Sequence, residues 1–437
     1  MSKQMNFECF KGLRIAFAKR RPSSCIPLAQ RLRLVLGRSI VQALTFQLAS
    51  AIVLCANCAI AQITPDSTLP NNSTVKLEGN TRIIEGGTSA GSNLFHSFSE
   101  FSVPANNTAF FNNTPDIQNI ISRVTGNSIS NIDGIIRSLG TANLFLLNPN
   151  GIVFGENARV NIGGSFFATT AKSMKFADGW EFSANPQPTP LLTINVPVGL
   201  QFGSNAGSVS IRGSSLQVNP EKSLALIGGN VNIDGGKLIA PSGRVELGGV
   251  LGENTVELFP IGDFFGLNFP QGVPQADMSL TNQAEVNVLS SRGGSISVNA
   301  ANLNMSGESQ LLTGISGFGS PNTQAGDIKI NATGIVALAG GSKIFNEVAQ
   351  NAVGNSGNIN ITTASLSLSN NSFLAASTKG EGNAGNVTIN TGSLSVAEGS
   401  FFAASANGQG NAGNITINAR DIVSFSKGSR AYTDVTT

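Results

Sequence analysis

The sequence predicts an all-β chain that folds as a right-handed parallel β-helix, or β-solenoid, with an N-terminal cap. Fifty glycines among 437 residues, only 12% charged residues and a strand pattern that recurs near the C-terminus lead to this prediction. Such a composition favours many short strands and turns over long helices. A leucine-rich repeat would need an Asn-bearing leucine motif that is missing, and a propeller would need about 40 residues per blade.

The first 61 residues have the layout of a secretory signal peptide. Basic residues up to Arg38 precede an uncharged run from Ser39 to Ala61, which ends in the small-x-small sequence Ala59-Ile60-Ala61. This order predicts cleavage between Ala61 and Gln62. An uncleaved anchor is the competing interpretation, because the uncharged run is long enough to span a bilayer.

The charge and cysteine content change sharply after the predicted leader. Residues 62–437 carry 18 basic and 24 acidic residues, a net charge of −6, so they lack the electrostatic footprint of a nucleic-acid-binding protein. All four cysteines, at positions 9, 25, 55 and 58, lie in the leader. Their absence from the exported part indicates either a core that does not need disulfides or a chain that must stay threadable, because a closed loop could not pass a narrow pore.

The segment from Ile63 to Phe111 is mainly polar and is interrupted by short apolar stretches. Phe95, Phe98 and Phe101 recur every three residues around His96, a spacing that fits neither a clean strand nor a helical stripe. We expect an aromatic-rich cap that packs on the first coils, because an open sheet edge would template aggregation. His96 is interpreted as a structural histidine beside this cluster.

The stretch from Asn143 to Gly155 consists of two apolar, β-prone runs joined by the corner Asn148-Pro149-Asn150-Gly151. Asn first, Pro second and Gly fourth is the residue order of a type I turn. Pro149 presets φ, and the Asn148 side chain can bond the turn's own backbone. A turn between two strands is common, so the neighbouring motifs decide whether it has a further role.

Several separated motifs accompany this turn in a fixed order, and together they resemble the haemagglutination-activity domain of filamentous-haemagglutinin-like exoproteins of two-partner secretion systems. The motifs are Ser122-Arg123-Val124-Thr125-Gly126, Ser130-Asn131-Ile132-Asp133-Gly134, the turn at 148–151, Ala158-Arg159-Val160 and Gly163-Gly164-Ser165-Phe166. The resemblance is strong over residues 63–177 and looser to about residue 210.

The resemblance implies a secreted or cell-surface, adhesin-like protein of a Gram-negative-type bacterium. Residues 62–290 would be the secretion domain, read in the periplasm by the polypeptide-transport-associated (POTRA) domains of a dedicated outer-membrane β-barrel transporter. The family's recognition motif maps onto Asn148, Pro149, Asn150 and Gly151. A second family motif, Asn-Pro-Asn-Leu, is not found in this chain.

A repeat becomes plain after Gly294. Five copies of a Gly-x-apolar-polar-apolar strand begin at residues 294, 326, 357, 385 and 413, separated by 32, 31, 28 and 28 residues. A second strand is predicted at the ninth position after each glycine, at Leu303, Ile335, Leu366, Leu394 and Ile422, and a third segment carries Leu312, Phe345, Phe373 and Phe401. Three strands per period are the signature of stacked coils that share one core.

Residues 291–437 would then be the first coils of the passenger. The last copy stops part-way through a coil at Thr437, so either the terminal coil is left open or, as we expect, the natural chain is longer or its reading frame is truncated. Asn358, Asn386 and Asn414 recur at the coil corners, where they either form stacked amide ladders or simply tolerate turn conformations. Repeats this uniform offer a surface for a host, cell-surface or carbohydrate ligand rather than a pocket.

The sequence gives little support for an enzyme or a cofactor. Nucleophilic triads and zinc sites need His or Cys, and residues 62–437 contain one His and no Cys. A carbohydrate-active β-helix enzyme, as a polysaccharide lyase or hydrolase, would need stacked carboxylates, yet Asp234, Asp263, Asp277 and Asp327 are scattered. This enzyme class and a structural surface protein stay open as alternatives to the adhesin-like exoprotein.

Overall fold

A computed structural model describes residues 62–186, 192–261 and 264–436. The predicted signal peptide, Ala61 included, lies outside the described residues. Residues 61–437 form one compact unit, and its described part contains strands and no helix. Consequently, no helix in the described residues could cross a membrane.

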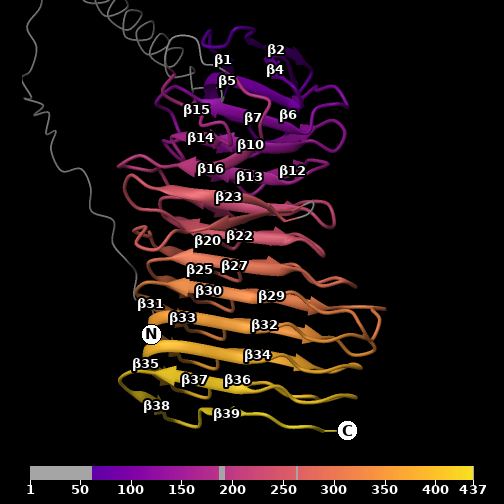
Figure 1. The fold of residues 1–437 in the computed structure, drawn as a ribbon, viewed down its shortest axis with the longest axis vertical. Coiled ribbons are helices and arrows are strands. Elements are labelled where there is room, and N and C mark those ends of the chain that lie inside the picture. The colour runs from indigo at the N-terminus through magenta and orange to yellow at the C-terminus, as the bar shows by residue number, and fades with distance from the viewer. Residues whose placement is uncertain (1–61, 187–191, 262–263, 437) are drawn as a thin grey trace, which may run out of the picture. The chain divides into compact units, whose positions relative to one another are not determined.

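Short strands in this unit stack coil upon coil, as Figure 1 shows from the indigo to the yellow end. Inward side chains of successive coils pair in register because each parallel strand lies directly beside its counterpart one coil later. One column runs from Leu94 through Ile120, Leu144, Phe166, Leu224, Val245, Ile296, Ile328, Ile359 and Val387 to Ile415. This continuous core confirms the predicted parallel β-helix.

The N-terminal end is closed by antiparallel strands. β1 and β4 pair with β5, and β2 pairs with β3. The strands of this region are β1 (Ile63–Pro65), β2 (Ser73–Glu78), β3 (Thr81–Gly86), β4 (Thr88–Ala90), β5 (Asn93–Phe101) and β6 (Thr108–Phe111). The antiparallel strands of the cap lie mainly in residues 63–90, and β3 and β5 also pair in parallel with β6 and β7, which joins the cap to the coils.

The three phenylalanines assigned to the cap from the sequence lie on β5 instead. Phe98 and Phe101 point into the main core, and Phe95 points to a second cluster on the other side of the strand. A register shift in the pairing of β5 with β1 lies between Phe98 and Glu100, which explains how residues three apart share one face. His96 is buried among Phe98 and Phe111, as the sequence indicated.

The coils after the cap contribute up to three strands each. In chain order they are β7 (Asn119–Val124), β8 (Ser130–Ile132), β9 (Ile135–Ser138), β10 (Asn143–Leu147), β11 (Ile152–Phe154), β12 (Arg159–Asn161), β13 (Phe166–Thr169), β17 (Val209–Arg212), β18 (Ser215–Gln217), β19 (Ser223–Gly228), β20 (Val231–Asp234), β21 (Lys237–Ile239), β22 (Arg244–Gly249), β25 (Met278–Thr281) and β26 (Glu285–Asn287).

Two excursions leave the coil path and meet in a five-stranded antiparallel sheet. They contribute β14 (Ser173–Phe176), β15 (Glu181–Ser183), β16 (Pro197–Gln201), β23 (Thr255–Ile261) and β24 (Phe264–Asn268), in the order β15-β14-β16-β23-β24. This sheet covers the outer face of the coils. Phe145 and Phe167 of the coils pack there with Met174, Leu200 and Val256 of the excursions.

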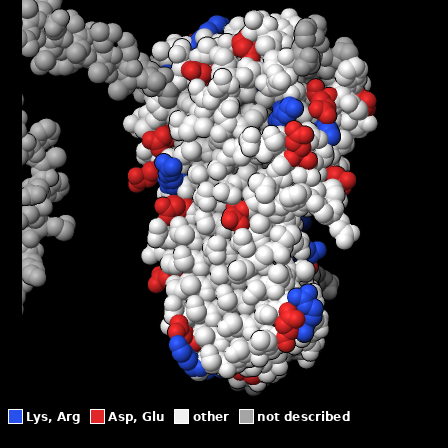
Figure 2. All heavy atoms as spheres, turned by 90° about the vertical axis from the view of Figure 1, so that its left-hand side faces the viewer, with Lys and Arg blue, Asp and Glu red and all other residues white. Residues whose placement is uncertain are grey.

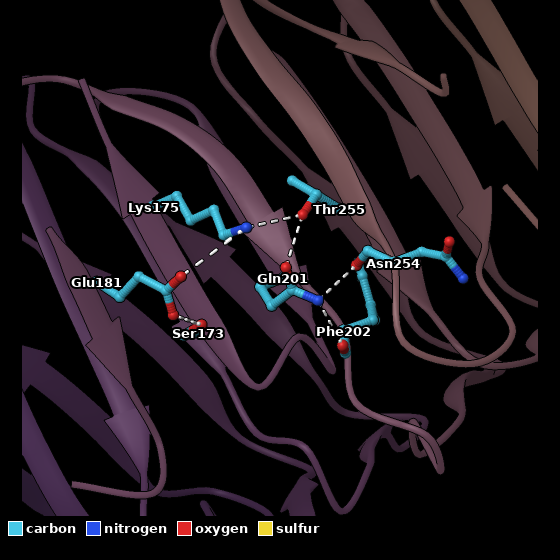
Figure 3. Close-up of polar contacts among 7 residues, drawn as sticks. All are labelled: Ser173, Lys175, Glu181, Gln201, Phe202, Asn254 and Thr255. Carbon is cyan, nitrogen blue, oxygen red and sulfur yellow. Dashed lines mark hydrogen bonds and ion pairs between the residues drawn. The ribbon is translucent and has the colours of Figure 1, made fainter. Parts of the chain in front are cut away.

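A chain of polar contacts crosses the other face of the five-stranded sheet (Figure 3). Lys175 lies 3.8 Å from Glu181 and donates a 2.9 Å hydrogen bond to Thr255, whose hydroxyl donates to Gln201. These residues come from β14, β15, β16 and β23, so the contacts link strands up to 80 residues apart.

The repeats form the remaining coils. Their strands are β27 (Ser295–Ala300), β28 (Leu303–Met305), β29 (Gln310–Ile315), β30 (Ile328–Ala332), β31 (Ile335–Leu338), β32 (Lys343–Val348), β33 (Ile359–Leu368), β34 (Phe373–Thr378), β35 (Val387–Val396), β36 (Phe401–Ala403), β37 (Ile415–Ala419), β38 (Val423–Phe425) and β39 (Arg430–Tyr432).

The second predicted strand is off by one residue in two copies. Val336 pairs with Leu303 and Leu366 in the core, while Ile335 is 48% exposed. In the last copy Val423 pairs with Leu394, although Val423 is itself 49% exposed, and Ile422 is more exposed, at 66%. In both copies the connection between the first and second strands is one residue longer, which moves the inward position from the ninth to the tenth residue after the glycine.

Of the residues predicted in the third segment, Leu312 is buried, whereas the three phenylalanines face outward. Phe345, Phe373 and Phe401 are half-buried, while their neighbours Ile344, Leu374 and Phe402 fill the core. Phe373 and Phe401 stack with ring centroids 4.9 Å apart. The guanidinium of Arg430 lies 5.9 Å from the centre of the Phe401 ring, so this aromatic ladder on the surface is itself packed.

Asn358, Asn386 and Asn414 lie one above another at the coil corners and are joined by hydrogen bonds from backbone to side chain, not by bonds between their side-chain amides. The Asn358 side-chain oxygen accepts a hydrogen bond from the Asn386 backbone N–H, and Asn386 repeats the contact with Asn414 at 2.8 Å. None of the three has a positive φ, so tolerance of a left-handed conformation does not explain them.

Candidate functional site

The corner at residues 148–151 is the type I-like turn that the sequence predicted. The Gly151 backbone N–H donates to the Asn148 carbonyl at 3.1 Å, closing the four-residue turn. The Asn148 side-chain oxygen accepts hydrogen bonds from the backbone N–H and the side-chain amide of Asn150, both at 3.0 Å. The turn connects β10 to β11, two inward-packed strands of one coil.

Hydrogen bonds fix this turn to both neighbouring coils. Toward the preceding coil, the Asn148 amide donates to the Ser128 carbonyl at 3.0 Å and to the Ser130 hydroxyl at 2.9 Å. Toward the following coil, the Gly207 N–H donates to the Pro149 carbonyl at 2.8 Å. A Cβ on Gly207 would lie 2.3 Å from the Asn150 carbonyl carbon, so the two corners touch backbone to backbone.

The four residues of the turn differ in accessibility. Asn148 is fully buried and Gly151 is buried, whereas Pro149 is half-buried and Asn150 is exposed. Ile129, 44% exposed, lies beside the turn in the preceding coil. A partner that met the folded chain would therefore touch Pro149, Asn150 and Ile129. We call these three residues the turn face.

No charged residue belongs to the segments that surround the turn face, residues 125–132 and 203–211. Figure 2 shows a similar picture on one side of the molecule, where acidic and basic side chains occur singly or in small groups between wide uncharged areas. Contact at the turn face would thus depend on shape, hydrogen bonds and a small apolar area rather than on long-range attraction.

The neighbouring motifs serve coil stacking. The Asp133 carboxylate accepts a 2.9 Å hydrogen bond from the Asn157 N–H one coil later. A Cβ on Gly163 would lie 1.9 Å from the Gly140 carbonyl oxygen. These residue types are therefore needed where one corner rests directly on another, and they do not form a pocket with the turn.

Sequence reasoning missed the buried network around Arg123 and Asp66. Arg123 is fully buried on β7 and donates to the hydroxyls of Ser97 (2.9 Å) and Thr68 (2.7 Å) and to the Ser183 carbonyl (2.6 Å). Asp66 accepts from Thr68, Ser97 and Thr125, and these hydrogen bonds lower its pKa against the opposing effect of burial. The sequence feature that could have indicated this network is one charged residue, Arg123, in the otherwise uncharged and largely apolar run Ile120–Val124.

Among the described residues, no carboxylate forms a direct ion pair with Arg123. Burial lowers the pKa of its guanidinium to about 10, and the charge of Asp66 acts in the opposite direction. The guanidinium also lies 4.2 Å from the centre of the Phe182 ring. A buried charge with this set of partners is costly to expose or to leave unpaired.

The carboxylates considered for catalysis have structural partners. Asp234 accepts from Thr281, Asp277 from Asn302 and Asp327 from Asn358, in each case on the next coil. Asp263 lies outside the described residues. Within the described part of the chain, no group of three His, Cys, Asp or Glu residues could hold a metal ion.

Of the predicted cleavage pair, Gln62 is the first described residue, and its carbonyl accepts a 3.1 Å hydrogen bond from the Ser102 N–H. The chain is thus attached to β5 and its continuation from its first described residue onward. Whether Ala61 and Gln62 are separated by a peptidase stays a prediction.

Residues 61–298 match the model of the TPS secretion domain, the export domain of two-partner secretion proteins. The chain belongs to this family. A search of curated protein sequences found no match.

A solved structure of a TPS secretion domain is similar in fold. The chain resembles the crystal structure of the HMW1 secretion domain from Haemophilus influenzae with a TM-score of 0.60 and 19% identity, over 86% of this chain and all of that one. It also matches the filamentous hemagglutinin secretion domain, with a TM-score of 0.37 and 15% identity, over 85% of this chain and 99% of that one.

This TPS protein is therefore a filamentous-haemagglutinin-like exoprotein of a two-partner secretion system, as its motifs suggested. Membership of the family assigns it a cognate outer-membrane transporter as partner and a secreted or cell-surface location. TPS secretion domains are export domains, so export rather than catalysis is the function that the match assigns to this region.

Proposed function

We propose that residues 62–290 direct export by docking on the periplasmic POTRA domains of the cognate transporter, and that the turn at 148–151 is the docking signal. The accessibility of its residues carries this proposal. Asn150 and Pro149 can touch a partner, while Asn148 is buried and positions Asn150 through two hydrogen bonds. Gly151, with φ +132°, gives the turn its exit direction.

Two kinds of variant separate contact from positioning. Asn150→Ala removes an exposed side chain together with its amide hydrogen bonds to the Gly126 carbonyl (2.7 Å) and to Asn148, so export should fall while circular dichroism of the purified protein stays like that of the wild type. Asn148→Ala removes bonds to Ser128, Ser130 and Asn150, so it should reduce export and also loosen the coil corner. Full-length protein is quantified in periplasm, cell surface and medium, beside circular dichroism of purified 62–437.

Asn386→Ala serves as the matched control. Its side chain is also an amide at a coil corner, bonded to the next coil, but it lies in the repeats. Export of this variant should equal that of the wild type. If Asn150→Ala is exported normally and reaches the medium, the turn is only a structural corner of the β-helix and not a docking signal.

We further propose that export is coupled to folding outside the cell and that residues 291–437 begin the passenger. Coils that contact mainly their neighbours can fold as they emerge, which opposes back-sliding without nucleotide hydrolysis. The outward faces of the repeats would then present an extended surface to a host, cell-surface or carbohydrate ligand. A disulfide engineered across two repeat coils should stall export under oxidising conditions, and unaffected secretion would contradict this coupling.

A further inference from the structure

The first part of the unit is held together by contacts that skip whole coils. Arg123 on β7 donates to Thr68, 55 residues earlier, and to the Ser183 carbonyl, 60 residues later. The cap, the second coil strand and the first excursion therefore share one buried cation. If any of these segments were absent, the guanidinium would lose hydrogen-bond partners that the complete fold supplies.

A second contact of this kind joins the cap region to the end of the first excursion. The buried side-chain amide of Asn93 donates to the Thr193 carbonyl at 3.0 Å and to the Asn195 carbonyl at 2.8 Å, about 100 residues away. Its side-chain oxygen accepts from Asn119 on the next coil. Both ends of this amide are satisfied only when residues 93, 119 and 193–195 are all in place.

The second excursion extends the connection further. β23 pairs with β16 from Gly199–Glu257 to Gln201–Thr255, and no other described strand covers that side of β16. Phe265 on β24 packs edge-on against Phe145 and Phe167, at centroid distances of 5.8 and 5.6 Å. The apolar cluster that includes Phe95 is thus completed by residues up to Leu267.

The repeats are connected differently. Among the described residues after Gly294, hydrogen bonds join residues at most 34 positions apart, which is about one coil. Their strands likewise pair with the coil before and the coil after. Each repeat coil therefore depends on its immediate neighbours alone.

We infer that residues 62–268 are one cooperative folding unit, which forms only when the second excursion has joined, whereas the repeat coils open and close one after another. The inference is independent of the proposed docking role of the turn. This differs from simple coil-by-coil folding, because the N-terminal coils would become stable only after β23 and β24 have folded onto them. The long segments that must be brought together make an early partial fold entropically unfavourable.

Hydrogen–deuterium exchange of purified 62–437 at increasing denaturant tests this inference. We compare wild type with Arg123→Met and with Phe265→Leu, two changes at opposite ends of the unit. Each should accelerate exchange of the protected amides in β5, β10, β16 and β23 by one common factor, about tenfold or more for Arg123→Met, because buried partners are left unsatisfied. Exchange in β33 and β35 should not change.

Ile389→Ala is the matched control in the repeats, where Ile389 is fully buried on β35. It should accelerate exchange in β33, β35 and β37 and leave β5 and β16 unchanged. Acceleration that fades coil by coil from position 123 or 265, or that reaches β33 equally, would overturn the inference. If Arg123→Met does not fold, Phe265→Leu decides it by whether amides of β5 respond.

Discussion

The side-chain oxygen of Asn358 accepts a 2.9 Å hydrogen bond from the backbone N–H of Asn386, which occupies the same corner one coil later. Asn386→Ala removes the corresponding acceptor for Asn414, and we expect a loss of about 1 kcal/mol in the free energy of unfolding. Urea denaturation of 62–437 measures it. Thr388→Ala, a nearby outward position on β35, should change stability by less than about 0.5 kcal/mol. Equal effects would contradict a role for these hydrogen bonds.

Acid should destabilise the fold through His96. Burial lowers the pKa of His96 from 6.5 to about 3, so between these values the unfolded chain binds a proton that the folded chain does not. Stability present above pH 6.5 is therefore lost as pH falls toward 3, with a slope of about 1.4 kcal/mol per pH unit. Urea midpoints across this range measure the slope.

His96→Gln is the comparison, because it removes the titrating imidazole and leaves every carboxylate in place. Burial raises the pKa of Glu246, which gives a contribution of opposite sign just above pH 4.5, and this contribution is common to both proteins. The difference between the two curves isolates His96. Parallel curves would show that the histidine is not the acid-sensitive group.

The corrected register of the repeats predicts opposite effects at adjacent residues. Val336 is fully buried, and Ile335 is 48% exposed. Val336→Ala should cost about 2 kcal/mol of unfolding free energy, because it leaves a cavity in the core. Ile335→Ala should stay within about 0.5 kcal/mol of wild type. If Ile335→Ala were the more destabilising variant, Ile335 would be the inward residue, as the sequence pattern predicted.

Gly163 should not tolerate a side chain. The Cβ of Gly163→Ala would lie 1.9 Å from the Gly140 carbonyl oxygen, so one corner must move away from the next. We expect a loss of at least about 2 kcal/mol, seen as a lower melting temperature. In Gly203→Ala the new Cβ would meet nothing nearer than Lys172 at 3.7 Å, and that variant should melt like the wild type.

The sequence was informative where a feature repeats locally. Each glycine that opens a repeat is followed by inward residues at fixed positions, so Ile328 and Ile330 could be placed correctly from the pattern alone. The second strand failed where one extra residue precedes it, because a shift of one position moves every side chain to the opposite face. The hydrophobicity of Ile335 and Val336 does not distinguish the two registers.

Features that depend on distant partners could not be predicted. The pairing of β16 with β23 joins residues more than 50 positions apart and leaves no local periodicity in the sequence. Arg123 belongs to one of the sequence motifs, but its hydrogen bonds to Thr68 and Ser183 join distant segments, so its burial could not be predicted. The turn at 148–151 was recognised because the hydrogen bond that closes it lies within four residues, whereas its bonds to neighbouring coils could not be predicted.

The last complete repeats also bear on how this chain can change during evolution. Ile359, Val387 and Ile415 occupy one column at intervals of 28 residues, and the Asn corners repeat at the same interval. A genetic deletion or duplication of one such interval would join surfaces that already match. Recombination between repeats can therefore alter the number of coils in whole steps, while an insertion of any other length within a strand would be selected against.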